Sequence, residues 1–227
     1  MRKMYKEGFS LIELMIAMAI TVIVMAGIIT LIAYSTRSMN LTQARAALQD
    51  QAKDAVNHIS TRVMEGNSVT PYDDAVSGDS KTRGALLIQN KTIKNDGTEE
   101  FTWYLYWVSA GLSSGDPDML CFAPLEDLAS ETSQPPIPDE YEKKNDTEKL
   151  SYLSALIPAV ESSGLQKGHL LCDDVEKFEC EVQQKEDPAD STVKVGRQFL
   201  SVSLALKDEQ SEFQCDKEIM MRNQKRG

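Results

Sequence analysis

The sequence predicts an α+β fold in which one long N-terminal helix packs on an antiparallel β-sheet. An uncharged apolar run is too long for a strand, helical periodicity continues to about residue 65, and strand-like alternation dominates the remainder. The 227 residues are 41% hydrophobic and 26% charged, which is typical of one globular domain with an additional segment. A large multidomain enzyme is therefore excluded.

The apolar run extends from Leu14 to Ala33 and contains no charge and no proline. At about 1.5 Å per residue, a helix of this length crosses a hydrocarbon core of roughly 30 Å. A cleaved secretory signal would have an apolar stretch of only about 7 to 15 residues, so a single membrane span is favoured. Arg2, Lys3 and Lys6 precede the span and predict a cytoplasmic N-terminus, with the following chain outside.

One acidic residue, Glu13, lies at the cytoplasmic edge of this span. A charged side chain at the bilayer centre costs about 2.5 to 3.5 kcal/mol, so such residues are rare and need a partner. The simpler alternative is that the carboxylate extends to the lipid headgroups. We expect Glu13 to have a functional partner.

The segment KEGFSLIELMIAMAI, from Lys6 to Ile20, resembles the class III signal of type IV prepilins and pseudopilins. Its features are a short basic leader, Gly8, Phe9 and a glutamate five residues after the glycine. The resemblance implies that a prepilin peptidase cuts between Gly8 and Phe9 and methylates the new amino-terminal Phe9. It also implies that Glu13 of one subunit pairs with the Phe9 amine of its neighbour during filament assembly.

A pilin-like architecture with three parts follows from this resemblance. Residues 1–8 would be a cleaved leader, residues 9–65 a helix, and residues 66–227 an exported α/β head. The helix would contain the span at about 14–33 and an amphipathic part at about 38–65. The implied partners are the prepilin peptidase, other pilins or pseudopilins, the inner-membrane assembly platform and membrane lipid.

Helical periodicity beyond the span supports one continuous helix to about Glu65. Apolar residues recur there at three- and four-residue intervals, while charged residues take the other side. Gly66 should end the helix, because glycine tolerates the left-handed conformation. The alanine-rich stripe favours packing on the chain's own head over an ordinary coiled coil. The periodic positions are Leu41, Ala44, Leu48, Ala52, Ala55, Val56, Ile59 and Val63.

Alternating apolar and polar residues predict strands in the head at 101–108, 178–182 and 199–206. The first of these should be a central strand against the helix. Two shorter apolar pieces, at 85–88 and 119–123, are weaker candidates. Residues 150–159 fit either a helix or a strand, and the proline-containing segment 131–149 is interpreted as an exposed loop.

Short head fragments at 101–105, 175–178 and 221–223 resemble J-type minor pseudopilins and W-type minor pilins. They favour a minor over a major subunit. The net charge of −11, from 24 basic and 35 acidic residues, repels phosphate backbones, so no nucleic-acid partner is expected.

Four cysteines, all in the exported head, lie in a compartment that permits disulfides. Three pairings are open, and free buried cysteines are the alternative. In one extended strand Cys172 and Cys180 would be about 26 Å apart, so they could pair only if residues 173–174 form a turn. The candidate disulfide residues are Cys121, Cys172, Cys180 and Cys215.

Catalytic and cofactor motifs are not recognisable. His58 and His169 suggest no nucleophilic arrangement, and a zinc site with His169, Cys172 and Cys180 lacks a closely spaced cysteine pair. Acidic residues at 73–74, 116, 118 and 173–174 could hold calcium, but solvated loop carboxylates are the simpler interpretation. We expect no enzyme activity, no metal and no cofactor.

Two functions are compatible with these observations. The favoured one is a minor pilin or pseudopilin that helps initiate or cap a type IV pilus or type II secretion pseudopilus. It would first be a single-pass protein of the cell membrane and then enter the filament. The alternative is a membrane-tethered extracellular binding or adhesive module. Cleavage after Gly8 distinguishes them, because a simple anchor retains its leader.

Overall fold

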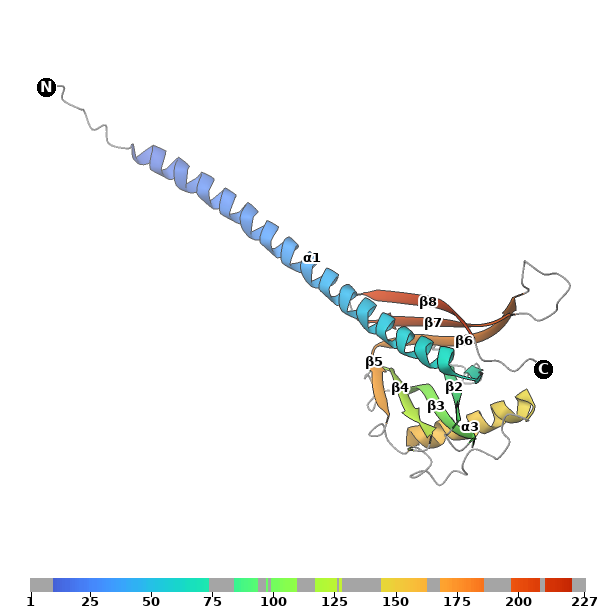
Figure 1. Ribbon diagram of the computed structural model, residues 1–227. Coiled ribbons are helices and arrows are strands. Elements are labelled where there is room, and N and C mark those ends of the chain that lie inside the picture. Colours follow the sequence, from blue (N-terminus) through green and yellow to red (C-terminus); the bar gives the residue numbers. More distant parts are fainter. Residues whose placement is uncertain are drawn as a thin grey trace. The chain divides into compact units, whose positions relative to one another are not determined.

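The computed structural model describes residues 10–73, 84–93, 97, 99–109, 117–125, 127, 144–162, 168–185, 197–208 and 211–221. The chain divides into two compact units, Met1–Ala44 and Arg45–Gly227. Figure 1 shows their helices and strands. We call them the N-terminal unit and the C-terminal unit.

Helix α1 (Leu11–Glu65) confirms the long helix and belongs to both units. In the N-terminal unit every residue from Ser10 to Gln43 is exposed. Within the described chain, α1 is the one helix long and apolar enough to cross a membrane. The Thr21 hydroxyl donates to the Ala17 carbonyl at 2.8 Å, which satisfies this hydroxyl inside the helix, as a lipid environment requires.

The predicted end of α1 is confirmed, but for a different reason than the one expected. Gly66 has no positive φ. Instead, a Cβ at this position would lie 2.9 Å from the Ile88 Cγ2 atom, so glycine lets the end of the helix approach the neighbouring strand closely. The Gly66 amide donates to the Val63 carbonyl at 3.2 Å.

Two antiparallel sheets follow α1, confirming the α+β class (Figure 1). The five-stranded sheet has the order β1-β2-β3-β4-β5, and the three-stranded sheet has the order β6-β7-β8. In the first, the strands are β1 (Ser68–Asp73), β2 (Gly84–Ile93), β3 (Glu99–Ser109), β4 (Met119–Pro124) and β5 (His169–Cys172). In the second, they are β6 (Val175–Lys185), β7 (Arg197–Lys207) and β8 (Glu212–Met220).

All five predicted strand segments lie in strands, and β3 is central in its sheet, as expected. Strands β1, β5 and β8 had not been predicted. The ambiguous segment 150–159 is helical and belongs to α3 (Asp146–Ser162).

The prediction of a loop at 131–149 is wrong at its C-terminal end, because α3 begins at Asp146. Residues 131–143 lie outside the described part. Asn145 caps this helix: its Oδ1 accepts the Glu148 amide at 2.8 Å, and its carbonyl accepts the Lys149 amide at 3.1 Å. The capping contact explains why a polar stretch starts a helix.

The hydrophobic core consists of two clusters on opposite faces of the five-stranded sheet. In the first, α1 packs on both sheets, and in the second α3 covers the other face of the five-stranded sheet. Strand β3 contributes Tyr106 and Val108 to the first cluster and Leu105 and Trp107 to the second. The alternation of β3 was therefore predicted correctly, and both of its faces are buried.

The two sheets meet where β2 approaches β6. A Cβ on Gly84 would clash with the carbonyl oxygen of Phe178, whose side chain is fully buried. The absence of a side chain at Gly84 permits this contact between the sheets.

Candidate functional site: the start of the N-terminal helix

Helix α1 begins directly after Ser10, which acts as its N-terminal cap. The Ser10 carbonyl accepts the amides of Glu13 at 3.0 Å and Leu14 at 3.2 Å. In return, the Ser10 amide donates to Oε2 of Glu13 at 3.1 Å. This is the backbone-directed half of a capping box, in which an acidic residue three positions after the cap satisfies the cap amide.

The capping contact holds the Glu13 carboxylate at the positive end of the helix dipole. A free helix N-terminus leaves four amides without intrahelical acceptors, and each is costly in lipid. Glu13 thus has a local partner within its own chain. The other two predicted residues of this site, Gly8 and Phe9, lie outside the described part.

An apolar surface follows along the first turns of α1. Eight residues line a shallow groove at three- and four-residue intervals, as expected for one face of a helix. The exposed apolar surface would be unstable in water and suits lipid or the apolar face of another helix. The lining residues are Leu14, Ala17, Met18, Thr21, Val22, Met25, Ala26 and Ile29.

A family model described as the prokaryotic N-terminal methylation motif matches residues 3–29. The chain carries the class III signal of type IV pilins and pseudopilins. The match includes the capped start of α1 and ends inside this helix, so it does not extend to the C-terminal unit. No curated protein and no solved structure matches the chain.

The signal supports a pilin-like or pseudopilin-like subunit, and the apolar N-terminal helix fits a membrane anchor. The signal also implies processing by a prepilin peptidase and assembly with other pilins. The motif suggests a structural subunit.

The four cysteines of this pilin-like subunit are free thiols in the structure. Burial raises the pKa of Cys121 to about 11 and that of Cys172 to about 12, with Asp173 contributing to the second shift. Both thiols are protonated at neutral pH and react slowly. Cys121 belongs to the α3 cluster and Cys172 to the α1 cluster, on opposite faces of the sheet.

The other two cysteines, Cys180 on β6 and Cys215 on β8, are half-buried against the α1 cluster. Strand β7 separates them. Residues 173–174 do form the break between β5 and β6 that a pairing of Cys172 with Cys180 needs. Cys180, however, lies five residues into β6, roughly 17 Å along the strand from its start. A disulfide among the four stays a prediction.

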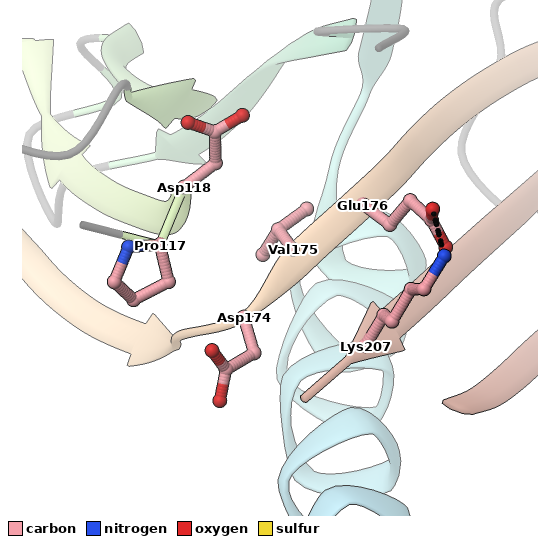
Figure 2. A pocket seen from close by; sticks show the side chains of 6 residues that line it. All are labelled: Pro117, Asp118, Asp174, Val175, Glu176 and Lys207. Carbon is pink, nitrogen blue, oxygen red and sulfur yellow. Dashed lines mark hydrogen bonds and ion pairs between the residues drawn. The ribbon is translucent and has the colours of Figure 1, made fainter. Parts of the chain in front are cut away.

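A small pocket of about 100 Å³ lies at the junction of the two sheets, where β4 and β6 begin and β7 ends (Figure 2). Backbone hydrogen bonds connect its edges, from the Val175 amide to the Asp118 carbonyl at 2.9 Å and from the Lys207 amide to the Asp174 carbonyl at 2.8 Å. Lys207 Nζ pairs with Glu176 Oε1 at 2.9 Å. These hydrogen bonds therefore connect the two sheets at the edge of the pocket.

The acidic residues of this pocket do not form a metal site. Figure 2 shows the carboxylates of Asp118 and Asp174 pointing away from each other. No group of three His, Cys, Asp or Glu residues in the described part is arranged to hold a metal ion. Of the other acidic candidates, residues 74 and 116 lie outside that part. Burial, Asp173 and Asp208 raise the pKa of Asp174, whose φ of 57° is left-handed.

The sequence did not reveal which residues surround the two histidines. His58 on α1 and His169 at the start of β5 both contact the ring of Phe122. Only the pairing of β4 with β5 brings His169 to this position. No local pattern in the sequence could have indicated it.

Proposed function

We propose that this chain is a minor subunit of a type IV pilus or type II secretion pseudopilus that helps initiate or cap filament assembly. The match of the methylation motif to residues 3–29 carries the proposal. Cleavage would occur between Gly8 and Phe9, and methylation at the Phe9 amine. The C-terminal unit would lie outside the membrane, after a single span with a cytoplasmic leader.

The leader residues suit this processing step. Glycine at position 8 has no Cβ to obstruct a protease, and the basic residues before it keep the leader in the cytosol. After cleavage, the Phe9 amine would lie about 6 Å along the chain axis from Glu13 if the helix continued to it.

The capping contact gives Glu13 a defined orientation for assembly. Its Oε2 accepts the Ser10 amide, and Oε1 has no hydrogen-bond partner within the described residues. Oε1 could therefore accept the amine of a neighbouring subunit while Oε2 remains bonded. Opposite charges attract far more strongly in lipid than in water, so an unpaired register would be disfavoured.

A minor role is supported by the fragments that resemble minor subunits. Two of the three, at 101–105 and 175–178, lie in β3 and at the start of β6, and most of the third lies outside the described residues. The net charge of −11 gives no support for DNA uptake. The tethered-module alternative has no specific support from the structure.

Glu13 variants test the proposal. In Glu13→Val the chain should insert into the membrane and be cleaved, yet its recovery in purified filaments should fall at least about tenfold, because about 1.4 kcal/mol of lost pairing already has that effect. Asp54→Asn removes an exposed carboxylate from the same helix and should leave recovery unchanged. Normal recovery of Glu13→Val would contradict the charge pair.

Ser10 variants test the orientation of the carboxylate separately. Ser10→Pro removes the amide that Glu13 accepts, whereas Ser10→Ala keeps it. We expect reduced filament recovery for the proline variant alone, after correction for the amount of cleaved chain. Equal recovery for the two variants would refute the positioning role and leave the charge pair untouched.

A further inference from the structure

The two histidines of the chain meet at one aromatic ring, a feature that the proposed function does not use. His58 lies edge-on to Phe122 with ring centroids 4.8 Å apart, and His169 stacks on Phe122 at 6.1 Å. They come from different elements, α1 and β5. Phe122 is 7% exposed and belongs to the core cluster that contains α1.

A hydrogen bond of 3.1 Å joins His58 Nδ1 to the Tyr106 hydroxyl of β3. Tyr106 is fully buried, and His58 is the one hydrogen-bond partner of its hydroxyl within the described residues. A neutral imidazole protonated at Nε2 accepts the hydroxyl proton at Nδ1. A protonated imidazole has donors at both nitrogens, so the hydroxyl proton would lose its acceptor.

The charged groups around His58 also oppose its protonation. Burial lowers the pKa of His58 most, followed by Arg62 on the same helix and His169 on β5. Arg62 lies over the Tyr104 ring at 4.6 Å and forms an ion pair of 3.6 Å with Glu65.

Among the described residues, no carboxylate contributes to the shift of the His58 pKa. Strand β3 faces His58 with Tyr106, and strand β4 faces it with Phe122. From β8, Lys217 Nζ donates to Asn57 Oδ1 at 2.8 Å, beside His58 on the helix. A positive charge at His58 would thus be disfavoured by Arg62 and His169 and would leave the buried Tyr106 hydroxyl without its acceptor.

We propose that His58 is an acid-sensitive latch that holds the second part of α1 on the five-stranded sheet. The neutral imidazole accepts the Tyr106 hydroxyl and packs on Phe122, and protonation removes the hydrogen-bond acceptor. The latch lies within the C-terminal unit and does not depend on the filament role. Because this pKa is lower in the folded chain than in the unfolded chain, the stabilisation is present above about pH 6.5 and is lost as the pH falls below it.

Hydrogen exchange on the full-length chain in detergent micelles measures the latch directly. Exchange in peptides covering residues 52–63 is compared at pH 7.5 and 5.0 after correction for intrinsic rates. The unmodified chain should lose protection roughly three- to tenfold at pH 5.0. In His58→Asn the amide oxygen can accept the Tyr106 hydroxyl and never becomes charged, so the loss should disappear.

Two controls keep the test decisive. His169→Asn removes the second imidazole and should reduce the loss without abolishing it. In Tyr106→Phe the hydroxyl is absent, so the pH effect should shrink even though the ring remains. The same loss in His58→Asn as in the unmodified chain would overturn the proposal.

An NMR titration of the unmodified chain covers the case in which a variant does not fold. The ring-proton signals of His58 should titrate below the ordinary value of about 6.5. Titration of His58 at or above 6.5 would also overturn the latch.

Discussion

Within α1, residues 11–43 expose their side chains, whereas the part from Leu48 to Val63 buries seven residues in the C-terminal unit. The described residues of the family motif, 10–29, lie in the exposed part. An exposed apolar helix is stable only if lipid or other chains cover it, so its sequence is constrained by partners outside the chain. The buried part is constrained by its own core. The family motif ends within the first part, and no curated protein or solved structure matches the chain.

The same substitution in the two parts should give the largest difference. Ile59 is fully buried and Ile23 is 72% exposed. Ile59→Ala should lower the free energy of unfolding of the C-terminal unit by about 2 to 5 kcal/mol, because it removes buried methyl groups and leaves a cavity. Ile23→Ala should leave it unchanged. Denaturant titration of the full chain, followed by the fluorescence of Trp103 and Trp107, measures the free energy of unfolding of both variants. Equal losses in the two variants would contradict the difference between the exposed and the buried part of α1.

Gly84 in the C-terminal unit and Gly27 in the exposed part of α1 allow the same comparison for an added Cβ atom. Gly84→Ala should destabilise the C-terminal unit by about 1 to 3 kcal/mol, because the new Cβ meets the Phe178 carbonyl. Gly27→Ala adds a Cβ with no atom within 4 Å and should cause no such loss. Thermal unfolding of both variants tests this, and a stable Gly84→Ala would show that the sheets can separate without cost.

The Asn145 cap gives a smaller effect, confined to α3. Asn145→Ala should cost about 0.5 to 2 kcal/mol, since the Glu148 amide loses its acceptor. Asn145→Ser retains a capping oxygen and serves as the control. Faster hydrogen exchange at residues 146–150 in the alanine variant alone would agree with the cap, and identical exchange in both variants would refute it.

Asp174 should give the smallest effect, and one that depends on pH. Asparagine tolerates the left-handed φ of 57° and removes a carboxylate whose pKa is raised by burial and by Asp173 and Asp208. Because this pKa is higher in the folded chain, the charged form weakens the fold at neutral pH. Asp174→Asn should therefore raise Tm slightly at pH 7, and the gain should vanish as falling pH protonates Asp174. A gain independent of pH would contradict this cause.

Much of the fold could be predicted because its patterns are local. The uncharged run and the alanine-rich stripe determine α1, and strict alternation marks β3, β6 and β7. Strand β8 was missed because Cys215 and Lys217 occupy inward positions and weaken its apolar alternation. The division into two sheets depends on long-range pairing and on the turn at Asp174, which no local pattern encodes.

The functional residues, too, could be predicted only where a local sequence pattern marks them. Glu13 was identified because a charge beside an apolar run is conspicuous, and the Ser10 contact follows a recognisable three-residue spacing that had not been used. The cluster of His58, Tyr106, Phe122 and His169 combines residues from four elements. It became visible only when α1 and the five-stranded sheet were in place.

The most direct test of the central claim is mass spectrometry of the intact chain and its N-terminal peptide, extracted from membranes with and without the prepilin peptidase of the host. The pilin-like account predicts a chain that starts at methylated Phe9 when the peptidase is present and retains its leader when the peptidase is absent. A chain that keeps Gly8 and the residues before it under both conditions would contradict the account.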